Sequence, residues 1–400
     1  MDARKSTQWE WIVLAAAGTV LVTQGVRQSL GLFVAPIDAA TGIGIAGISL
    51  ALAVAQFSWG AVQPIAGAVA DRYGPGRVLA AGIVLLAIGS ALAPFAHTSL
   101  GFALTLGVLA ASGAGAASFS VLMGAASRLL PPEKRGFAAG LINAGGSFGQ
   151  FIFAPLLQVL IAAFSWTGAL FTTALIVICA LPLTHVLRKP AEAATSVSTG
   201  GGLRSAVKTA LGDRSYMLLH AGFFTCGFHI AFLVTHLPGE IALCGLSPTV
   251  ASWSLAIIGL ANVAGSLGAG WGVGRYLSKH VLFAMYASRT ALILLYLAAP
   301  KTPTTFYLFA AGLGMTWLAT IPPTATVVTK LFGARYLSTL FGLTLLSHQI
   351  GGFLGAWLGG IVVTRFGNYD WMWYADATLA LAAAFINLPI REPQFARATA

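Results

Sequence analysis

The sequence predicts an all-α polytopic membrane protein, with twelve transmembrane helices in two six-helix bundles related by pseudo-symmetry. Three observations support this fold class: the composition, the number of apolar stretches and an internal repeat. Hydrophobic residues make up 57% of the 400 residues and charged residues only 8%, whereas about 25% of the residues in a soluble domain are charged. The chain therefore belongs in a lipid bilayer.

Apolar windows of about 20 residues, the length that crosses a bilayer, occur twelve times. The first half holds them at 10–35, 46–70, 78–96, 100–127, 137–161 and 167–187. The second half holds them at 215–237, 248–273, 280–299, 303–328, 337–363 and 371–390. Between them, 188–213 is a long polar stretch that is typical of a linker. We therefore expect a first bundle at 1–187, a cytoplasmic linker at 188–213 and a second bundle at 214–400.

The basic residues predict the orientation in the membrane. With the N-terminus in the cytoplasm, eighteen of the 22 Lys and Arg residues fall on the cytoplasmic side and two in outer loops. The positive-inside rule then places both termini in the cytoplasm, with the chain in the cell inner membrane. The net charge of +11 is thus a topology signal, and we expect no nucleic-acid partner. The last two bases, Arg27 and Arg289, lie inside spans.

The two halves repeat each other at an offset of 202 to 203 residues. The string Thr-Gln-Gly-Val-Arg at 23–27 returns as Thr-Cys-Gly-Phe-His at 225–229. Further on, 67–79 aligns with 270–282, and Gly149 matches Gly351. Because six spans is an even number, the halves share one orientation. This pattern is typical of transporters built from parallel repeats around an axis along the membrane normal.

The loop between the second and third spans carries a family resemblance. From Gly67 to Arg77 the chain reads Gly, three residues, Asp71-Arg72, one residue, Gly74, and later a basic residue. This string resembles the signature of the major facilitator superfamily, and with twelve spans and a central linker the resemblance covers the whole chain. The stretches 25–36, 59–77 and 347–349 resemble bacterial members of the monocarboxylate-porter branch.

The resemblance implies that this loop forms a gating latch. The carboxylate of Asp71 would meet the positive N-terminal end of the eleventh span, which is worth typically about 0.3–1 kcal/mol when exposed. Gly67 would let helices approach closely, and Gly74 would serve the tight turn. The alternative is a simple positively charged stop-transfer loop. The expected gating residues are Gly67, Asp71, Arg72, Gly74, Arg77 and Arg128.

Two ionisable residues at matching depths suggest a central site. Such a residue costs about 2.5–3.5 kcal/mol in the membrane core and marks a functional site by default. By resemblance, spans one, four, seven and ten line the cavity, so Arg27 and His229 would face each other near the midplane. A guanidinium suits a carboxylate, and a histidine can switch its proton. Alternatively, Arg27 pairs with a backbone carbonyl or with Asp38, and His229 is a hydrogen-bonded core histidine.

Three further polar residues are candidates for substrate contact. Arg289, halfway along the ninth span, either reaches inward to the substrate or serves as a structural ion partner. His348 and Gln349, in the middle of the eleventh span, either contact the substrate or form an interhelical hydrogen bond. The resembled branch carries a carboxylate and an arginine four residues apart in its eighth span. Here Asn262 and Ser266 stand there without charge, which departs from that pattern.

No enzyme constellation is present in the sequence. It lacks paired carboxylates, a metal-spaced Cys/His cluster and a phosphate-binding glycine loop, so we expect no enzyme activity, cofactor or metal. We expect a monomeric secondary transporter that carries a small organic anion, a monocarboxylate, by alternating access. If protons are coupled, His229 would carry them, because no Asp or Glu is expected in mid-cavity. The alternatives are an efflux transporter for a hydrophobic or amphipathic compound and a non-transporting membrane sensor.

Overall fold

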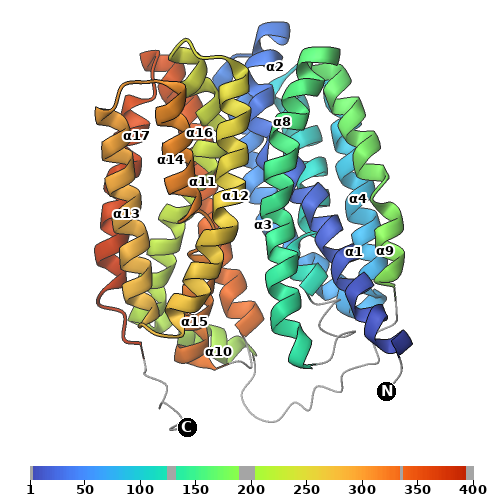
Figure 1. Ribbon diagram of the computed structural model, residues 1–400, viewed down its shortest axis with the longest axis vertical. Helices are drawn as coiled ribbons and strands as arrows, with labels where there is room; N and C mark the ends of the chain where they lie inside the picture. Colours follow the sequence, from blue (N-terminus) through green and yellow to red (C-terminus); the bar gives the residue numbers. More distant parts are fainter. Residues whose placement is uncertain (1–2, 124–131, 189–202, 334–336, 393–400) are drawn as a thin grey trace.

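A computed structural model describes residues 3–123, 132–188, 203–333 and 337–392, and over these ranges the chain is helical with short connections. Figure 1 shows two groups of roughly parallel helices side by side, the first half in blue to green and the second in yellow to red. We call the end where α1 begins and α17 ends the terminal face, and the opposite end the loop face. The all-helical fold class is confirmed.

The first half contains five of the expected spans as separate or kinked helices and the sixth as a continuation of the fifth. Its elements are α1 (Ala3–Gln28), η1 (Leu30–Phe33), α2 (Val34–Thr41), α3 (Ile45–Tyr73), α4 (Pro75–Leu92), η2 (Ala93–Phe95), α5 (Ser99–Phe102), the π-helical η3 (Ala103–Ala110), α6 (Ala111–Ala116), α8 (Pro132–Ile178) and α9 (Leu181–Val186). Within α8, Phe164 and Ser165 leave helical geometry, and Ser165 has φ 60°. This kink separates the fifth span from the sixth.

The second half follows the same plan. Its elements are α10 (Leu203–Gly212), α11 (Arg214–Leu243), α12 (Pro248–Val273), α13 (Ser278–Ala298), α14 (Pro303–Gly314), α15 (Ile321–Phe332), α16 (Leu337–Phe366) and α17 (Asp370–Asn387). The tenth span is broken between α14 and α15, where Pro322 and Pro323 stand at the start of α15. Proline lacks the N–H that a continuous helix would need there.

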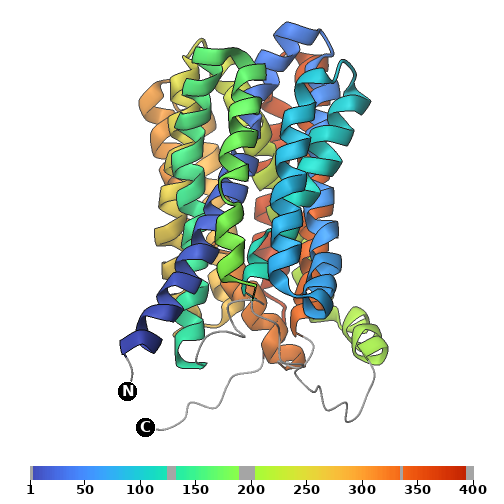
Figure 2. The same ribbon diagram turned by 90° about the vertical axis from the view of Figure 1, so that its right-hand side faces the viewer.

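The helices account for the expected crossings. Nine helices in the described ranges are long and apolar enough to cross a membrane, with the 47-residue span containing α8 counted once. The broken pair α14–α15 and the helix α17 coincide with the expected tenth and twelfth spans. One difference concerns the linker, because its last part forms the helix α10, which projects from the side of the bundle at the terminal face in Figure 2.

Glycines of the internal repeat create matching helix contacts in the two halves. The α1 helix packs along α8, and α11 packs along α16. A Cβ on Gly149 would overlap the Leu21 carbonyl, and a Cβ on Gly351 would overlap that of Phe224. Likewise, a Cβ on Gly227 would overlap the His348 carbonyl oxygen. Small residues allow such close backbone approach where lipid offers no hydrophobic driving force.

We expect Gly227→Ala to destabilise the protein, because the added methyl meets backbone that cannot rotate away. Overpacking of this kind costs about 1–3 kcal/mol. A matched control is Gly268→Ala, in the interior of α12, where a Cβ meets no described atom within 4 Å. That change should gain up to about 1 kcal/mol of helix propensity. Thermal unfolding in detergent tests the pair, and equal melting temperatures would contradict the packing described here.

The two halves contact each other toward the loop face. There α3 packs on α16, with Gly60 against Gln349 and Gly360 against Ser49, and α12 packs on α8, with Gly259 against the Ser147 carbonyl. Nearer the terminal face, the repeat-related glycines have no described atom within 4 Å of an added Cβ. These are Gly67, Gly140, Gly270 and Gly342. The close glycine contacts described between the halves therefore lie in the middle of the helices and toward the loop face.

Candidate functional site

Arg27 lies just before a break in the first span. The α1 helix ends at Gln28, and the chain continues through η1, where Gly31 packs so closely on the Val234 carbonyl of α11 that only glycine fits. The Ser29 hydroxyl donates to the Gly25 carbonyl at 2.9 Å and stabilises the end of α1. The break thus fixes Arg27 near the middle of the 32-residue membrane segment from Glu10 to Thr41.

The partners of the Arg27 guanidinium are neutral. Its Nε donates to Gln24 Oε1 at 2.9 Å, and one terminal nitrogen donates to Gln56 Oε1 of α3 at 2.7 Å. Its Cζ lies 4.1 Å from the centre of the Trp59 ring. Arg27 retains 9% of its accessible surface. A guanidinium at membrane depth without a counter-charge is electrostatically incomplete.

Asp38 does not supply the missing charge. Its Oδ1 accepts the Gly44 backbone N–H at 2.8 Å, which holds the connection between α2 and α3 near the loop face. No ion pair to Arg27 occurs in the part of the chain that the structure describes. The predicted alternative, in which Arg27 pairs with Asp38, is therefore wrong.

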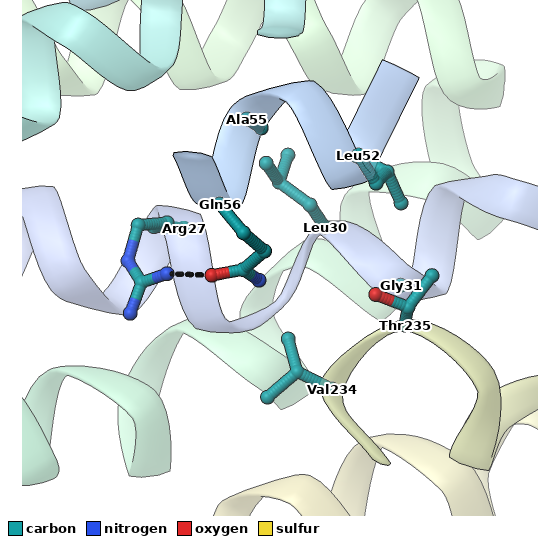
Figure 3. A pocket seen from close by; sticks show the side chains of 8 residues that line it. All are labelled: Arg27, Leu30, Gly31, Leu52, Ala55, Gln56, Val234 and Thr235. Carbon is teal, nitrogen blue, oxygen red and sulfur yellow. Dashed lines mark hydrogen bonds between the residues drawn. The ribbon is translucent and has the colours of Figure 1, made fainter. Parts of the chain in front are cut away.

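A small cavity adjoins Arg27. Its volume is about 10 Å³, and it is lined by α1, η1, α3 and α11. That volume is close to what one water molecule needs. Figure 3 shows Arg27 and Gln56 on one side of it, joined by their hydrogen bond, with Val234 and Thr235 of the second half on the other. The site therefore lies where the two halves meet.

His348 and Gln349 come from α16 in the second half. The His348 ring lies 4.8 Å from the Phe223 ring, and its Nδ1 is 3.3 Å from Gln349 Nε2. Gln349 packs against Gly60 of α3, and its Oε1 is buried with no partner among the described residues. Both residues are thus brought to the interface that contains Arg27.

Arg289 of α13 reaches inward to the break in the tenth span. One of its terminal nitrogens donates to the Thr316 carbonyl at 2.7 Å and to the Trp317 carbonyl at 3.4 Å. These carbonyls lie where α14 has ended, so they need such donors. The Nε and the other terminal nitrogen of Arg289 are buried without a partner in the described ranges. Arg289 therefore supports the break with only part of its hydrogen-bonding capacity.

His229 is not placed against Arg27. Its Nδ1 lies 2.5 Å from Asp376 Oδ2 of α17, and its ring lies 6.0 Å from the Trp317 ring. Both partners belong to the second half, and no described interaction joins His229 to Arg27. The contacts described for His229 therefore lie inside the second half and do not reach across the cavity to Arg27.

Asp376 is a buried carboxylate that was not singled out from the sequence, and it does not line the cavity beside Arg27. It is 1% exposed within α17, as is His229 within α11. Arg289 lies nearby, since it donates to the carbonyl of Trp317, whose ring lies 6.0 Å from that of His229. Asp376 Oδ1 and His229 Nε2 are buried and have no partner over the described ranges. Asp376, His229 and Arg289 thus form a buried cluster with unused hydrogen-bonding atoms.

Asn262, which stands where the resembled branch has a carboxylate, has a structural role. Its Nδ2 donates to Ser147 Oγ of α8 at 2.7 Å, and its Oδ1 accepts the Leu318 N–H at 2.9 Å. Asn262 thus ties the broken tenth span to the first half. Gln56, Trp59 and Asp376 were missed at the sequence level, although Gln56 and Asp376 carried the signal of a polar group inside an apolar run.

The signature loop lies at the terminal face. Gly74, between α3 and α4, has φ 93°, a conformation that favours glycine, so its predicted turn role is confirmed. Arg72 and Arg77 are exposed. Gly67 has no described atom near its Cβ position, so in this conformation it does not serve a close helix approach. Arg128 and the side chain of Asp71 lie outside the described residues, and the latch remains a prediction.

Comparisons with known proteins agree with this architecture. The major facilitator superfamily model matches residues 15–354 and 241–399. The chain is 27% identical to monocarboxylate transporter 13 of Bos taurus, over 94% of this chain and 87% of that protein. It is 25% identical to the oxalate:formate antiporter of Oxalobacter formigenes, over 90% of this chain and 86% of that protein.

A solved structure shares the fold. It is a bacterial homologue of the human lysosomal transporter Spinster, in an inward-facing and occupied conformation, with a TM-score of 0.72. The match covers 94% of this chain and 96% of that chain at 12% identity, so it shows the fold alone. Since the family model spans most of the sequence, the chain belongs to the major facilitator superfamily.

Proposed function

We propose that this membrane transporter carries a small monocarboxylate by alternating access, with Arg27 binding the carboxylate. The observation that carries the proposal is the buried Arg27 guanidinium, whose partners are the amides of Gln24 and Gln56 and the face of Trp59. An incoming carboxylate would supply the absent counter-charge through charge-assisted hydrogen bonds, which are roughly twice as strong as neutral ones. The names of the relatives support the same substrate class.

The position of Arg27 suits alternating access. The site lies where the two halves meet. On its loop-face side the halves are in close contact, and on its terminal-face side the repeat-related glycines have no described atom within 4 Å of an added Cβ. With both termini in the cytoplasm of the inner membrane, as the basic residues predict, this conformation is inward-facing. A carboxylate would then reach Arg27 from the cytoplasmic side, and the outward-facing state would require the halves to separate at the loop face.

Proton coupling is assigned to the pair of His229 and Asp376. His229 and Asp376 are both buried with Nδ1 and Oδ2 2.5 Å apart, so a proton added to this pair adds one positive charge to a buried cluster. A cluster with that extra charge would stabilise an anion in the neighbouring site and would be costly without one. This difference would link the movement of a proton to that of a carboxylate.

Uptake into proteoliposomes tests the substrate class. We expect small monocarboxylates to exchange with a preloaded labelled monocarboxylate, while their neutral amides do not, because only the charged form pairs with Arg27. A lipophilic cation of similar size serves as the control. Exchange of the amides or the cation at the rate of the carboxylates would contradict an anion site and would favour an efflux transporter.

A further inference from the structure

A groove on the outer side of the second half is separate from the Arg27 site. It is bounded by α11, α16 and α17, and its volume is about 480 Å³. The lining is mostly apolar and includes Met217, Ile350, Leu379 and Ala382. Met217 and Ile350 are each 45% exposed, and the main contacts of α17 are with α11, α13 and α16 of the second half. The groove therefore opens toward the surrounding lipid.

One polar pair interrupts the apolar lining. His220 of α11 places Nδ1 2.5 Å from Ser347 Oγ of α16. His220 is only 8% exposed, and its Nε2 is buried with no hydrogen-bond partner among the described residues. An unpartnered polar atom inside a membrane protein is costly. A ligand in the groove that carries a polar group at this depth would satisfy it.

Basic residues lie in the segments that adjoin the groove at the terminal face. Arg214 opens α11 three residues before Met217, so both lie on the same side of the helix. Arg391 follows α17, and its backbone N–H donates to Ser215 Oγ at 3.0 Å, which places it beside the start of α11. The adjoining helix α10 carries Arg204 and Lys208, four residues apart on one face and both exposed.

The carboxylates near this end of the groove are already engaged. Asp213 caps α11 by accepting the Tyr216 N–H at 2.8 Å. Glu392 accepts a hydrogen bond from Lys330 at 2.7 Å and the backbone N–H of Lys279 at 3.0 Å. Burial alone would raise the pKa of Glu392, but Lys330 and the backbone donors at the start of α13 hold that pKa below its usual value. The exposed basic residues therefore leave this corner positively charged.

We propose that the groove between α11, α16 and α17 binds one anionic phospholipid. The acyl chain lies along the apolar lining, and Arg214 with its basic neighbours holds the phosphate at the membrane interface. His220 is six residues from Arg214, about 9 Å along the helix. In the tautomer in which Ser347 donates to Nδ1, the Nε2–H of His220 donates to an ester carbonyl of the lipid.

The apolar lining of the groove and the basic residues near its end favour a lipid over a soluble anion. Basic residues near the surface attract anionic lipids by about 1 kcal/mol each. The amphipathic α10, with Val207 half-buried and Ala210 buried against the protein, is suited to the same interface. A free phosphate would use the basic end and leave the apolar groove and His220 unexplained. This inference does not depend on which substrate is transported.

Native mass spectrometry of the full chain tests the proposal, with phosphatidylglycerol and phosphatidylcholine of identical acyl chains as probes. We expect one phosphatidylglycerol to be retained, with an apparent Kd at least about tenfold lower than that of phosphatidylcholine. Equal values for the two lipids would overturn the proposal. Glycerol phosphate should not displace the bound lipid, and full displacement would also overturn it, because the acyl chain would then contribute nothing.

Groove-filling variants locate the lipid. Ala382→Trp should raise the apparent Kd for phosphatidylglycerol at least about tenfold, because the indole occupies the acyl path. Ala81→Trp is the matched control, since Ala81 is also exposed and lies six residues into α4 from the same face. Should Ala382→Trp fail to fold, Ala221→Phe fills the groove from α11. Unchanged lipid affinity in the folded groove variants would refute the site.

Charge variants test the headgroup contact separately. Arg214→Gln together with Lys208→Gln should weaken phosphatidylglycerol binding about tenfold and leave phosphatidylcholine unchanged. Arg275→Gln is the control, because Arg275 is an exposed base near the same face whose guanidinium lies 4.4 Å from the Trp271 ring, away from the groove. An equal effect of the control and the double variant would show a general surface charge effect and would overturn a specific lipid site.

Discussion

Arg27→Ala is expected to reduce carboxylate uptake by at least about 100-fold while the protein remains folded. Charge-assisted hydrogen bonds to a buried ion contribute about 1.5–3 kcal/mol each, and a carboxylate that binds Arg27 would lose more than one of them. Folding should survive, because removing a charge that has no ionic partner relieves a desolvation cost. Uptake of labelled monocarboxylate by proteoliposomes, beside a melting curve of the same preparation, measures both effects.

Two further variants make this expectation specific to the guanidinium. Arg27→Lys keeps the charge but loses the planar pair of donors, so it should retain activity between that of the alanine variant and the original chain. Arg365→Ala removes an exposed arginine near the loop face and should transport normally. Normal uptake by a folded Arg27→Ala variant would remove Arg27 from the binding site.

Asp376→Asn is expected to abolish proton-driven uptake while carboxylate exchange continues. The asparagine keeps the shape of the side chain and a hydrogen bond to His229, but it cannot hold a negative charge against the protonated ring. His229→Gln should give the same result. Either change removes one of the two groups, His229 Nδ1 and Asp376 Oδ2, that lie 2.5 Å apart and would share the proton. Asp370→Asn, at the exposed start of α17, is the control.

The readout for coupling is the external pH during substrate influx. Alkalinisation outside the vesicles should accompany uptake by the original chain and by Asp370→Asn, and should be absent in Asp376→Asn. If Asp376→Asn still shows alkalinisation, the proton is carried elsewhere. If the original chain shows none, the transporter works by exchange or as a uniporter.

The repeat and the order of the membrane-spanning helices were predictable because they depend on local sequence. Apolar length fixes the spans, and the offset that matches Gly149 to Gly351 reappears as equivalent helix contacts in the two halves. The burial of Arg27 also followed from its place in an apolar run. Each of these features depends on periodicity or on a residue type that membranes rarely accept.

The orientation of His229 was not predictable from its matching position. Its partner Asp376 is 147 residues away in sequence, and which helix the ring meets depends on how α11 rotates against α17. The support of the break at 315–320 was not predictable for the same reason. Arg289 of α13 and Asn262 of α12 hold the backbone that follows α14, so three different helices are involved. Tertiary packing of this kind leaves no local pattern, although Asp376 itself was visible as a carboxylate inside a span.

The binding of a carboxylate to Arg27 can be measured without transport. Calorimetric titration is carried out on the purified chain and on Arg27→Gln, with a small monocarboxylate and with its neutral amide. It separates the contribution of the ligand's charge to the binding affinity from that of its shape. The original chain should bind the carboxylate at least about tenfold more tightly than the amide, and Arg27→Gln should lose that preference. Equal carboxylate affinity in the two proteins would contradict an anion site at Arg27.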